Sequence, residues 1–159
     1  MEKIKMHAFW IYPITDEFVH DVNILLKQLT SNPPKYSIET LTKILQQQNL
    51  FVLGALDTYY GMIVGMASLK VVETTMLTQD YKTGFIGDVV VSSNYRRKGI
   101  AEEMMVTLIE IAKALNVTNL SLTSNPNNPD RTSAIKLYEK LGFKKAGELN
   151  GSNYYRLQL

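Results

Sequence analysis

The 159-residue chain contains no cysteine and only two histidines. Without thiols there is no disulfide framework, no thiolate metal site and no cysteine nucleophile. With His7 and His20 as the only imidazoles, a histidine-rich zinc site is not expected either. We therefore predict a protein that uses no metal. His20 is predicted to face solvent, and His7 lies in the first predicted strand.

The chain also has little net charge and no long hydrophobic run. Its 17 lysines and arginines nearly balance 15 aspartates and glutamates, which leaves a formal net charge of +2. A protein that coats nucleic acid would be far more basic. The least polar stretch, residues 61–69, is too short to cross a bilayer, and the first residues do not lead into an apolar signal segment. We expect no nucleic-acid partner, no membrane association and a cytoplasmic location.

Length and composition indicate one globular domain. Hydrophobic residues make up 45% of the chain and charged residues 20%, close to globular averages. Domains have roughly 150 residues, and a chain of this size buries about 70% of its unfolded surface. A single domain over residues 1–159 is therefore predicted.

The hydrophobic pattern predicts the order β-α-α-β-β-β-α-β-α-β-β. The first helix is predicted to start at Thr15 or Asp16, the second at Ser37, and the last to run from Asp130 to a left-handed Gly142. The strands are expected at residues 6–12, 50–56, 62–72, 85–91, 117–123, 143–146 and 154–157, and the third helix at residues 98–115. This order predicts an α/β fold with a mixed, mostly antiparallel sheet of six to seven strands and helices on both faces.

The most informative segment joins the valine-rich strand at residues 85–91 to the third helix. Arg96, Arg97 and Lys98 precede that helix, where the helix dipole makes cations unfavourable unless an anion compensates them. Gly99 and Ala101 are small enough for an anion to approach backbone N–H groups. The segment therefore predicts a phosphate site, although it matches neither the Walker A motif nor the dinucleotide-binding glycine motif.

Two motifs connect this segment to a known family. Arg96-x-x-Gly99-x-Ala101 resembles the (Gln/Arg)-x-x-Gly-x-(Gly/Ala) motif of the GNAT superfamily of acyl-CoA-dependent N-acetyltransferases. Downstream, Arg131-x-x-Ala134-x-x-Leu137-Tyr138-Glu139-Lys140-Leu141-Gly142-Phe143 is similar to the second motif of that superfamily. With the predicted order of elements, the resemblance covers almost the whole chain. It implies the GNAT fold.

The resemblance also implies a set of site residues. In the family, the matching strand pairs its backbone with the pantetheine arm of CoA, and the following turn holds the pyrophosphate through main-chain N–H groups. The two matching strands, residues 85–91 and 117–123, splay apart around the acetyl thioester. Tyr138 would contact CoA and protonate the departing sulfur, and Asn125 would be a further CoA contact. The other implied CoA-binding residues are Val89, Val90, Val91, Arg96, Arg97, Lys98, Gly99, Ile100 and Ala101.

The activity implied is transfer of an acetyl group from acetyl-CoA to a primary amine by direct attack in a ternary complex. Many relatives carry an acid at the position of Gly87, so the general base is left open between Asp88, Glu73 and water. Tyr138 also lies on the apolar face of its predicted helix. A tyrosine at such a position can be buried for packing alone, without a catalytic role. The alternative reading is a non-catalytic acyl-CoA sensor or interaction module. A homodimer is expected by family analogy, and the amine acceptor cannot be read from the sequence.

Overall fold

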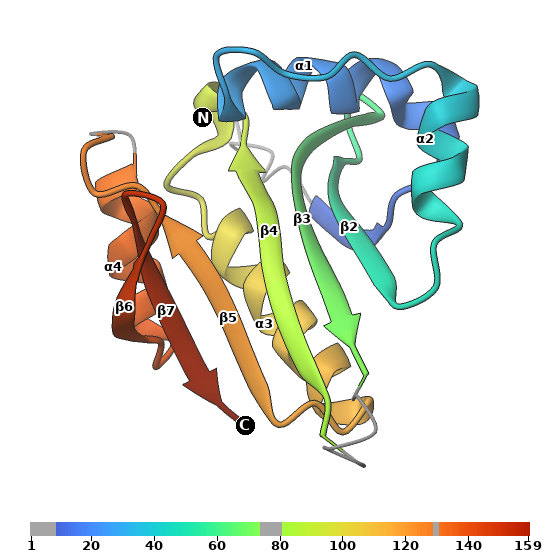
Figure 1. Cartoon of the computed structure of the whole chain (residues 1–159). Coiled ribbons are helices and arrows are strands. Elements are labelled where there is room, and N and C mark those ends of the chain that lie inside the picture. Colours follow the sequence, from blue (N-terminus) through green and yellow to red (C-terminus); the bar gives the residue numbers. More distant parts are fainter. Residues whose placement is uncertain (1–8, 74–80, 129–130) are drawn as a thin grey trace, which may run out of the picture. The chain divides into compact units, whose positions relative to one another are not determined.

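The structure is a computed structural model that describes residues 9–73, 81–128 and 131–159. His7 and Asp130, with the helix cap predicted for Asp130, lie outside these residues. The elements follow the predicted order (Figure 1). The strands are β1 (Phe9–Pro13), β2 (Leu50–Asp57), β3 (Met62–Val72), β4 (Thr83–Val91), β5 (Asn119–Ser124), β6 (Lys144–Leu149) and β7 (Ser152–Gln158). The helices are α1 (Val19–Leu29), α2 (Ile38–Leu45), α3 (Ile100–Ala114) and α4 (Thr132–Lys140), with short 3-10 turns η1 (Asp16–Phe18) and η2 (Ser93–Tyr95).

The seven strands are hydrogen-bonded in the order β1-β2-β3-β4-β5-β7-β6. β1 pairs with β2, β5 with β7, and β6 with β7, all antiparallel. β4 and β5 are parallel, with pairs running from Thr83 and Asn119 to Phe85 and Ser121. The predicted mixed, mostly antiparallel sheet is confirmed. The predicted splay of these two strands beyond the pairs stays a prediction.

The chain divides into two compact units. The first consists of Met1–Ser68 and Asp88–Leu108, and the second of Leu69–Gly87 and Ile109–Leu159. The first unit therefore holds the end of β4, the basic residues Arg96, Arg97 and Lys98, and the beginning of α3. The second unit holds β5, α4 and the last two strands. The single domain expected over residues 1–159 stays a prediction.

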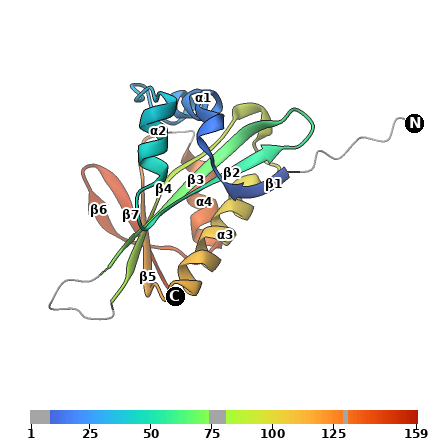
Figure 2. The same cartoon turned by 90° about the vertical axis from the view of Figure 1, so that its right-hand side faces the viewer.

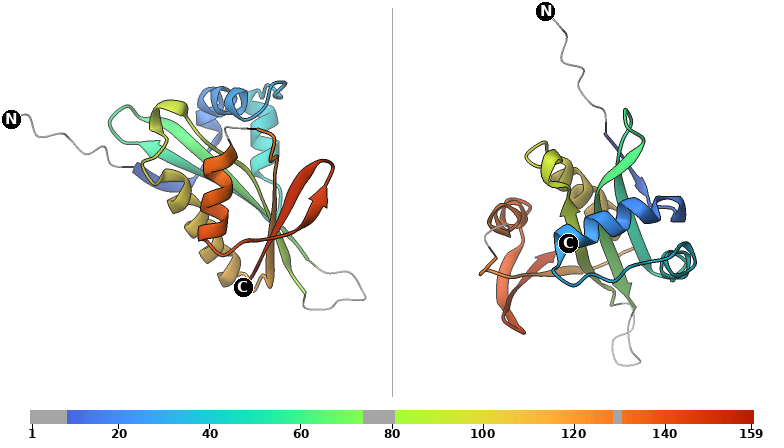
Figure 3. Two further views of the ribbon diagram at one scale, coloured as in Figure 1. Left: turned by 90° about the vertical axis from the view of Figure 1, so that its left-hand side faces the viewer. Right: turned by 90° about the horizontal axis from the view of Figure 1, so that it is seen from above.

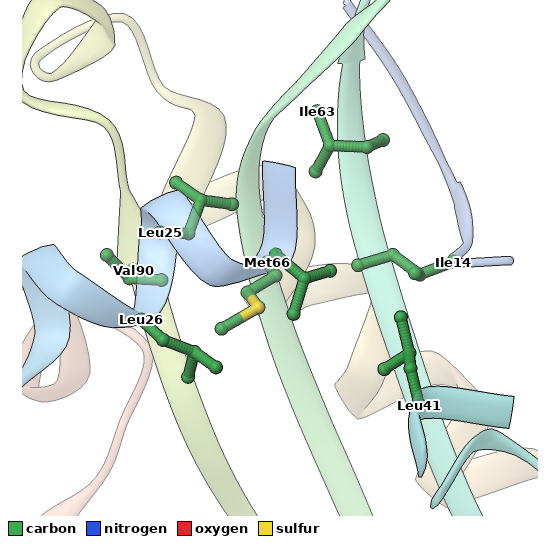
Figure 4. Packing of buried hydrophobic residues seen from close by; sticks show 8 residues of the cluster. Ile14, Leu25, Leu26, Leu41, Ile63, Met66 and Val90 are labelled. Carbon is green, nitrogen blue, oxygen red and sulfur yellow. The ribbon is translucent and has the colours of Figure 1, made fainter. Parts of the chain in front are cut away.

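The core of the first unit forms where α1 and α2 cover β3 and β4. Leu25 and Leu26 of α1 pack with Met66 and Val90, and Leu41 of α2 belongs to the same cluster (Figure 4). Each fully buried side chain of this kind contributes about 1.5–3 kcal/mol. The local sequence also starts α2 as predicted. The hydroxyl of Ser37 accepts the Thr40 N–H at 3.2 Å, and Thr40 Oγ1 accepts the Ser37 N–H at 2.9 Å.

The beginning of α3 packs on the other face of the same strands, so the first unit has helices on both faces (Figure 2). Gly65 of β3 permits this approach. A Cβ atom at Gly65 would lie 3.2 Å from Met104 Cε and 3.4 Å from Ile100 Cγ2. Because Ile100 and Met104 are almost fully buried, the first turns of α3 are held firmly against the sheet.

In the second unit, β5 alternates between buried and half-buried residues, and Leu120, Leu122 and Ser124 are its buried positions. α4 lies along one face of the strands β7 and β6 (Figure 3). Gly142 has φ +96° and its N–H donates to the Glu139 carbonyl at 3.0 Å, which confirms the predicted left-handed helix end. Phe143 then folds back so that its ring meets the Tyr138 ring at a centroid distance of 6.2 Å.

The start of the first helix is where the prediction was wrong. Neither Thr15 nor Asp16 caps α1, because the 3-10 turn η1 intervenes and α1 begins only at Val19. The Thr15 hydroxyl donates to the Glu17 carboxylate at 2.8 Å instead of accepting a helix N–H. A residue type that favours helix capping therefore indicates here the turn that precedes α1, and not the first residue of the helix.

Candidate functional site

The candidate site in the first unit is the basic turn, which we define as residues 96–99 between η2 and α3. The chain leading into it is fixed where it leaves β4. The Ser92 N–H donates to the Val64 carbonyl at 2.8 Å, and the Ser93 N–H donates to Gln28 Oε1 at 2.9 Å. The segment before the basic turn is thus held to β3 and to α1.

The backbone of the basic turn has the form of an anion-binding loop. Arg97 has φ +62° and Gly99 has φ +79°, both in the left-handed region. Turns of this kind aim successive N–H groups into one concavity. A Cβ atom at Gly99 would meet nothing within 4 Å, so the space beside this glycine is open. The small residue predicted to admit an anion therefore faces unfilled space.

The start of α3 adds further donors. The Glu103 N–H donates to the Gly99 carbonyl at 3.0 Å, so Gly99 is the N-cap of α3, whose first residue is Ile100. The N–H groups of Ile100 and Ala101 lie in the first turn, where helix geometry provides no intrahelical acceptor and the dipole is positive. The basic turn and the start of α3 thus bring backbone donors and positive charge together, an arrangement suited to a negatively charged group.

The three cations of the basic turn have different roles. Arg97 and Lys98 are exposed and place positive charge beside the open space. Arg96 Nε donates to the Val91 carbonyl at 3.1 Å, so this side chain ties the basic turn to the end of β4. The structure therefore gives Arg96 a bracing contact that the sequence did not indicate.

The end of β4 carries the remaining candidates of the first unit. Val90 and Val91 are buried, and Val89 is half-buried. Asp88 has φ +54°, and its exposed side chain accepts a hydrogen bond from the Ser68 hydroxyl at 2.8 Å. The structure thus brings the CoA-binding candidates from Val89 to Ala101 together with Asp88 in one unit.

The second unit carries Asn125, Tyr138 and Glu73. Asn125 is exposed, and its Oδ1 accepts the Asn127 N–H at 2.9 Å. Tyr138 is 3% exposed; burial raises the pKa of its phenol, and the charge of Arg131 opposes that rise. Glu73 is exposed and forms an ion pair with Lys82 at 3.7 Å.

Several residues that hold the site were missed from the sequence. Gln28, which accepts the Ser93 N–H, and Ser68, which donates to Asp88, lie far in the chain from their partners, so both pairings depend on the folded backbone. His20 is exposed, as predicted. Among residues 9–73, 81–128 and 131–159, no three potential metal-ligating side chains gather. Within the same ranges, no helix has the length and apolar character needed to cross a membrane.

A mixed α/β sheet in which a glycine-containing turn follows a strand and opens a helix is an arrangement suited to a phosphate-bearing ligand. Residues 22–143 match the model of the "Acetyltransferase (GNAT) family". The chain belongs to this family, which confirms the acyltransferase class expected from the two motifs. The match begins in the first unit and ends in the second.

Two curated proteins are similar to this chain. A probable glucosamine 6-phosphate N-acetyltransferase of Drosophila melanogaster is 32% identical over 122 residues, which cover 75% of this chain. The chain spans about half of that protein, 52% of its length. The glucosamine 6-phosphate N-acetyltransferase of Trypanosoma brucei brucei is 28% identical over 122 residues, covering 76% of this chain and 78% of the relative.

A solved structure shows the same fold. The PaiA N-acetyltransferase of Thermoplasma acidophilum, crystallised with coenzyme A, superposes with a TM-score of 0.74 and 16% identity. The superposition covers 96% of this chain and 99% of the other. The GNAT fold expected from the sequence is therefore confirmed.

Proposed function

We propose that this chain transfers an acetyl group from acetyl-CoA to a primary amine by direct attack in a ternary complex. The observation that carries the proposal is the basic turn, with its two left-handed residues and the open space at Gly99. Family membership and fold neighbours crystallised with coenzyme A or acetyl-CoA support acetyl-CoA as the group that fills this space. Acetyl-CoA is a cosubstrate here, and no metal takes part in the proposed reaction.

The basic turn would hold the diphosphate of CoA. The N–H groups of Gly99, Ile100 and Ala101 would donate to phosphate oxygens, and Arg97 and Lys98 would balance the charge. Hydrogen bonds to a charged group contribute about 1.5–3 kcal/mol each, so a few converging amides are sufficient for tight binding. Val89, Val90 and Val91 would pair with the pantetheine arm along β4, and Asn125 would make a further contact.

Tyr138 would act as the general acid. As the amine nitrogen bonds to the acetyl carbon, the carbon–sulfur bond breaks and the sulfur takes a proton from the phenol. Burial raises the pKa of Tyr138 above its usual value near 10, so the phenol is fully protonated at neutral pH. Because the usual thiol pKa of about 8.5 lies below that of the phenol, this proton transfer is uphill, and it is completed when the phenolate regains the proton that the attacking amine releases.

The amine must be neutral before it attacks. For an amine with a pKa of about 10.4, neutralisation near pH 7 costs about 4–5 kcal/mol. We assign the base to Asp88, directly or through a water, because it is exposed and its carboxylate is oriented by Ser68. Glu73 already pairs with Lys82, which makes it the weaker candidate.

The names of the curated relatives point to a first acceptor to test. The fruit-fly and trypanosomal relatives are named as acting on glucosamine 6-phosphate, a phosphorylated amino sugar. An amine flanked by electron-withdrawing hydroxyl groups loses its proton more readily than a lysine amine. Such an acceptor lowers the demand on the base, which suits a chain that has glycine rather than an acid at position 87.

Two measurements test the proposed function. Calorimetry should show one acetyl-CoA bound per chain, and thiol release should follow when glucosamine 6-phosphate is added. Unphosphorylated glucosamine, a polyamine and a peptide with a free N-terminus complete the panel. Absence of acetyl-CoA binding would refute the proposal. Binding without thiol release for any amine would favour the alternative, a non-catalytic acyl-CoA sensor or interaction module, for which Gly87 is the supporting feature.

A further inference from the structure

Ser124, the last residue of β5, carries a buried hydroxyl that is not hydrogen-bonded. The residue is 6% exposed, and within residues 9–73, 81–128 and 131–159 its Oγ has no hydrogen-bond partner. Burying a hydroxyl in this way costs free energy, because its hydrogen bonds to water are lost and not replaced. Native proteins rarely leave such a group unpaired, so each case needs an explanation. Ser124 has no part in the reaction described above.

Ser124 lies on the side of the sheet that α4 covers. Ser124 and Leu120 are alternating buried positions of β5, so they share one face. Leu120 pairs with Leu157 of β7, which places Leu157 on that face too. A Cβ atom at Gly142, just after α4, would lie 3.3 Å from Leu157 Cδ1. Ser124 is therefore on the same side of the sheet as the helix that carries the buried Tyr138, the proposed acid.

Within the part of the chain that the structure describes, β5 is paired on one side only at Ser124. On the β7 side, Ser124 pairs with Asn153. On the β4 side, the parallel pairs end at Phe85 and Ser121, three positions before Ser124. A strand edge of this kind can be approached by an extended chain that has its own amide groups.

We propose that the Ser124 hydroxyl hydrogen-bonds an amide carbonyl in the pantetheine arm of acetyl-CoA. This inference rests on the proposed function, which assigns acetyl-CoA to the chain and its sulfur to Tyr138. The pantetheine arm joins that sulfur to the diphosphate, and its amide groups need hydrogen bonds when they leave water. A serine hydroxyl can donate such a bond. Asn125, the next residue, is already a proposed CoA contact.

Ser124→Ala should weaken acetyl-CoA binding without lowering stability. In the free protein, the substitution removes a hydroxyl that has no partner, so the urea midpoint of unfolding should be unchanged or higher. In the complex it removes one hydrogen bond to the ligand, so the Kd for acetyl-CoA should rise about three- to tenfold. Calorimetry measures the Kd, and urea titrations without ligand measure the midpoint.

Ser68→Ala is the matched control, because Ser68 is a similarly buried serine whose hydroxyl has a partner. It is 5% exposed and donates to the Asp88 carboxylate at 2.8 Å. Ser68→Ala should therefore lower the urea midpoint and leave the Kd for acetyl-CoA within about twofold of wild type. If Ser124→Ala lowers the midpoint as Ser68→Ala does, Ser124 has a partner in the protein and the inference is overturned.

A fragment of CoA tests which part of the ligand Ser124 contacts. Adenosine 3′-phosphate 5′-diphosphate contains the diphosphate but lacks the pantetheine arm. Ser124→Ala should leave the Kd for this nucleotide unchanged, whereas Gly99→Glu, which places a carboxylate at the proposed diphosphate position, should abolish its binding. Equal losses of affinity for the nucleotide and for acetyl-CoA in Ser124→Ala would overturn the assignment to the pantetheine arm.

The outcomes separate the two proposals. Wild-type protein that does not bind acetyl-CoA refutes the proposed function. Wild-type protein that binds acetyl-CoA, together with a Ser124→Ala variant of equal Kd, refutes only the role of Ser124. Wild-type protein that binds acetyl-CoA but not the nucleotide contradicts the assignment of the diphosphate to the basic turn. The Kd for acetyl-CoA and the urea midpoint of Ser124→Ala then still decide the role of Ser124.

Discussion

Filling the space beside Gly99 should abolish acetyl-CoA binding. A Cβ atom there has no protein neighbour within 4 Å, so Gly99→Glu brings a carboxylate into the open space of the basic turn without a clash. The new side chain would occupy the position proposed for the diphosphate and would repel it. The fold should survive, because the change adds no atom to the core.

The magnitude follows from the bonds that would be lost. If two amide–phosphate bonds are displaced at about 1.5–3 kcal/mol each, binding weakens by about 3–6 kcal/mol, or roughly 10²- to 10⁴-fold. Stability should fall much less. Left-handed backbone costs a residue with a side chain roughly 1–2 kcal/mol, and Gly99 has φ +79°.

The chain provides a matched control for this prediction. Gly151, in the turn between β6 and β7, also has φ +79° and also has nothing within 4 Å of an added Cβ. Gly151→Glu therefore carries the same backbone strain and the same charge. Calorimetry with acetyl-CoA should show binding lost in Gly99→Glu and retained in Gly151→Glu. Equal affinities in the two variants would refute the assignment of the diphosphate to the basic turn.

Three further changes address catalysis and the core. Tyr138→Phe should lower kcat at least tenfold with acetyl-CoA affinity retained; an unchanged kcat in a thiol-release assay would remove Tyr138 from the acid role. Because burial raises the pKa of Tyr138, the stabilising effect of its proton is complete below about pH 10 and is lost as pH rises through the folded-state pKa, which unfolding curves at alkaline pH can follow. Ser68→Ala frees the Asp88 carboxylate and should lower kcat more than it raises KM for acetyl-CoA, and the reverse pattern would contradict an orienting role. Phe143→Ala removes a side chain that is 2% exposed and should reduce the free energy of unfolding by about 3–5 kcal/mol in urea titrations; a loss below about 1 kcal/mol would contradict its place in the core.

The sequence was sufficient for the fold because its signals are local. Alternation in residues 119–124, the capping box at Ser37 and the left-handed Gly142 each specify an element through neighbours in the chain. The start of α1 was mispredicted because Thr15 favours a turn as readily as a helix cap. The division into two units could not be predicted, since it depends on contacts between residues distant in the chain.

The candidate site was predictable where a motif carries its own chemistry. The basic turn could be identified because cations and small residues at a helix start have a physical reason to occur together. The residues that brace it could not. Gln28 appears in the sequence as an ordinary polar residue near the end of a helix, and only the fold shows that its Oε1 accepts the Ser93 N–H before the basic turn. The bracing contact of Arg96 with Val91 was hidden for the same reason.

The terminal strand of the sheet has a consequence for solubility. Every residue of β6 is exposed, and β6 pairs with β7 alone at the end of the strand order. Such a border is a template on which another polypeptide can add a strand and start aggregation. Two features oppose this: the charged side chains of Lys144, Lys145 and Glu148, and the irregular register between Lys145 and Gly147. Replacing both lysines with valine would leave an exposed, apolar edge strand. We therefore expect these lysines to oppose aggregation of the protein through β6.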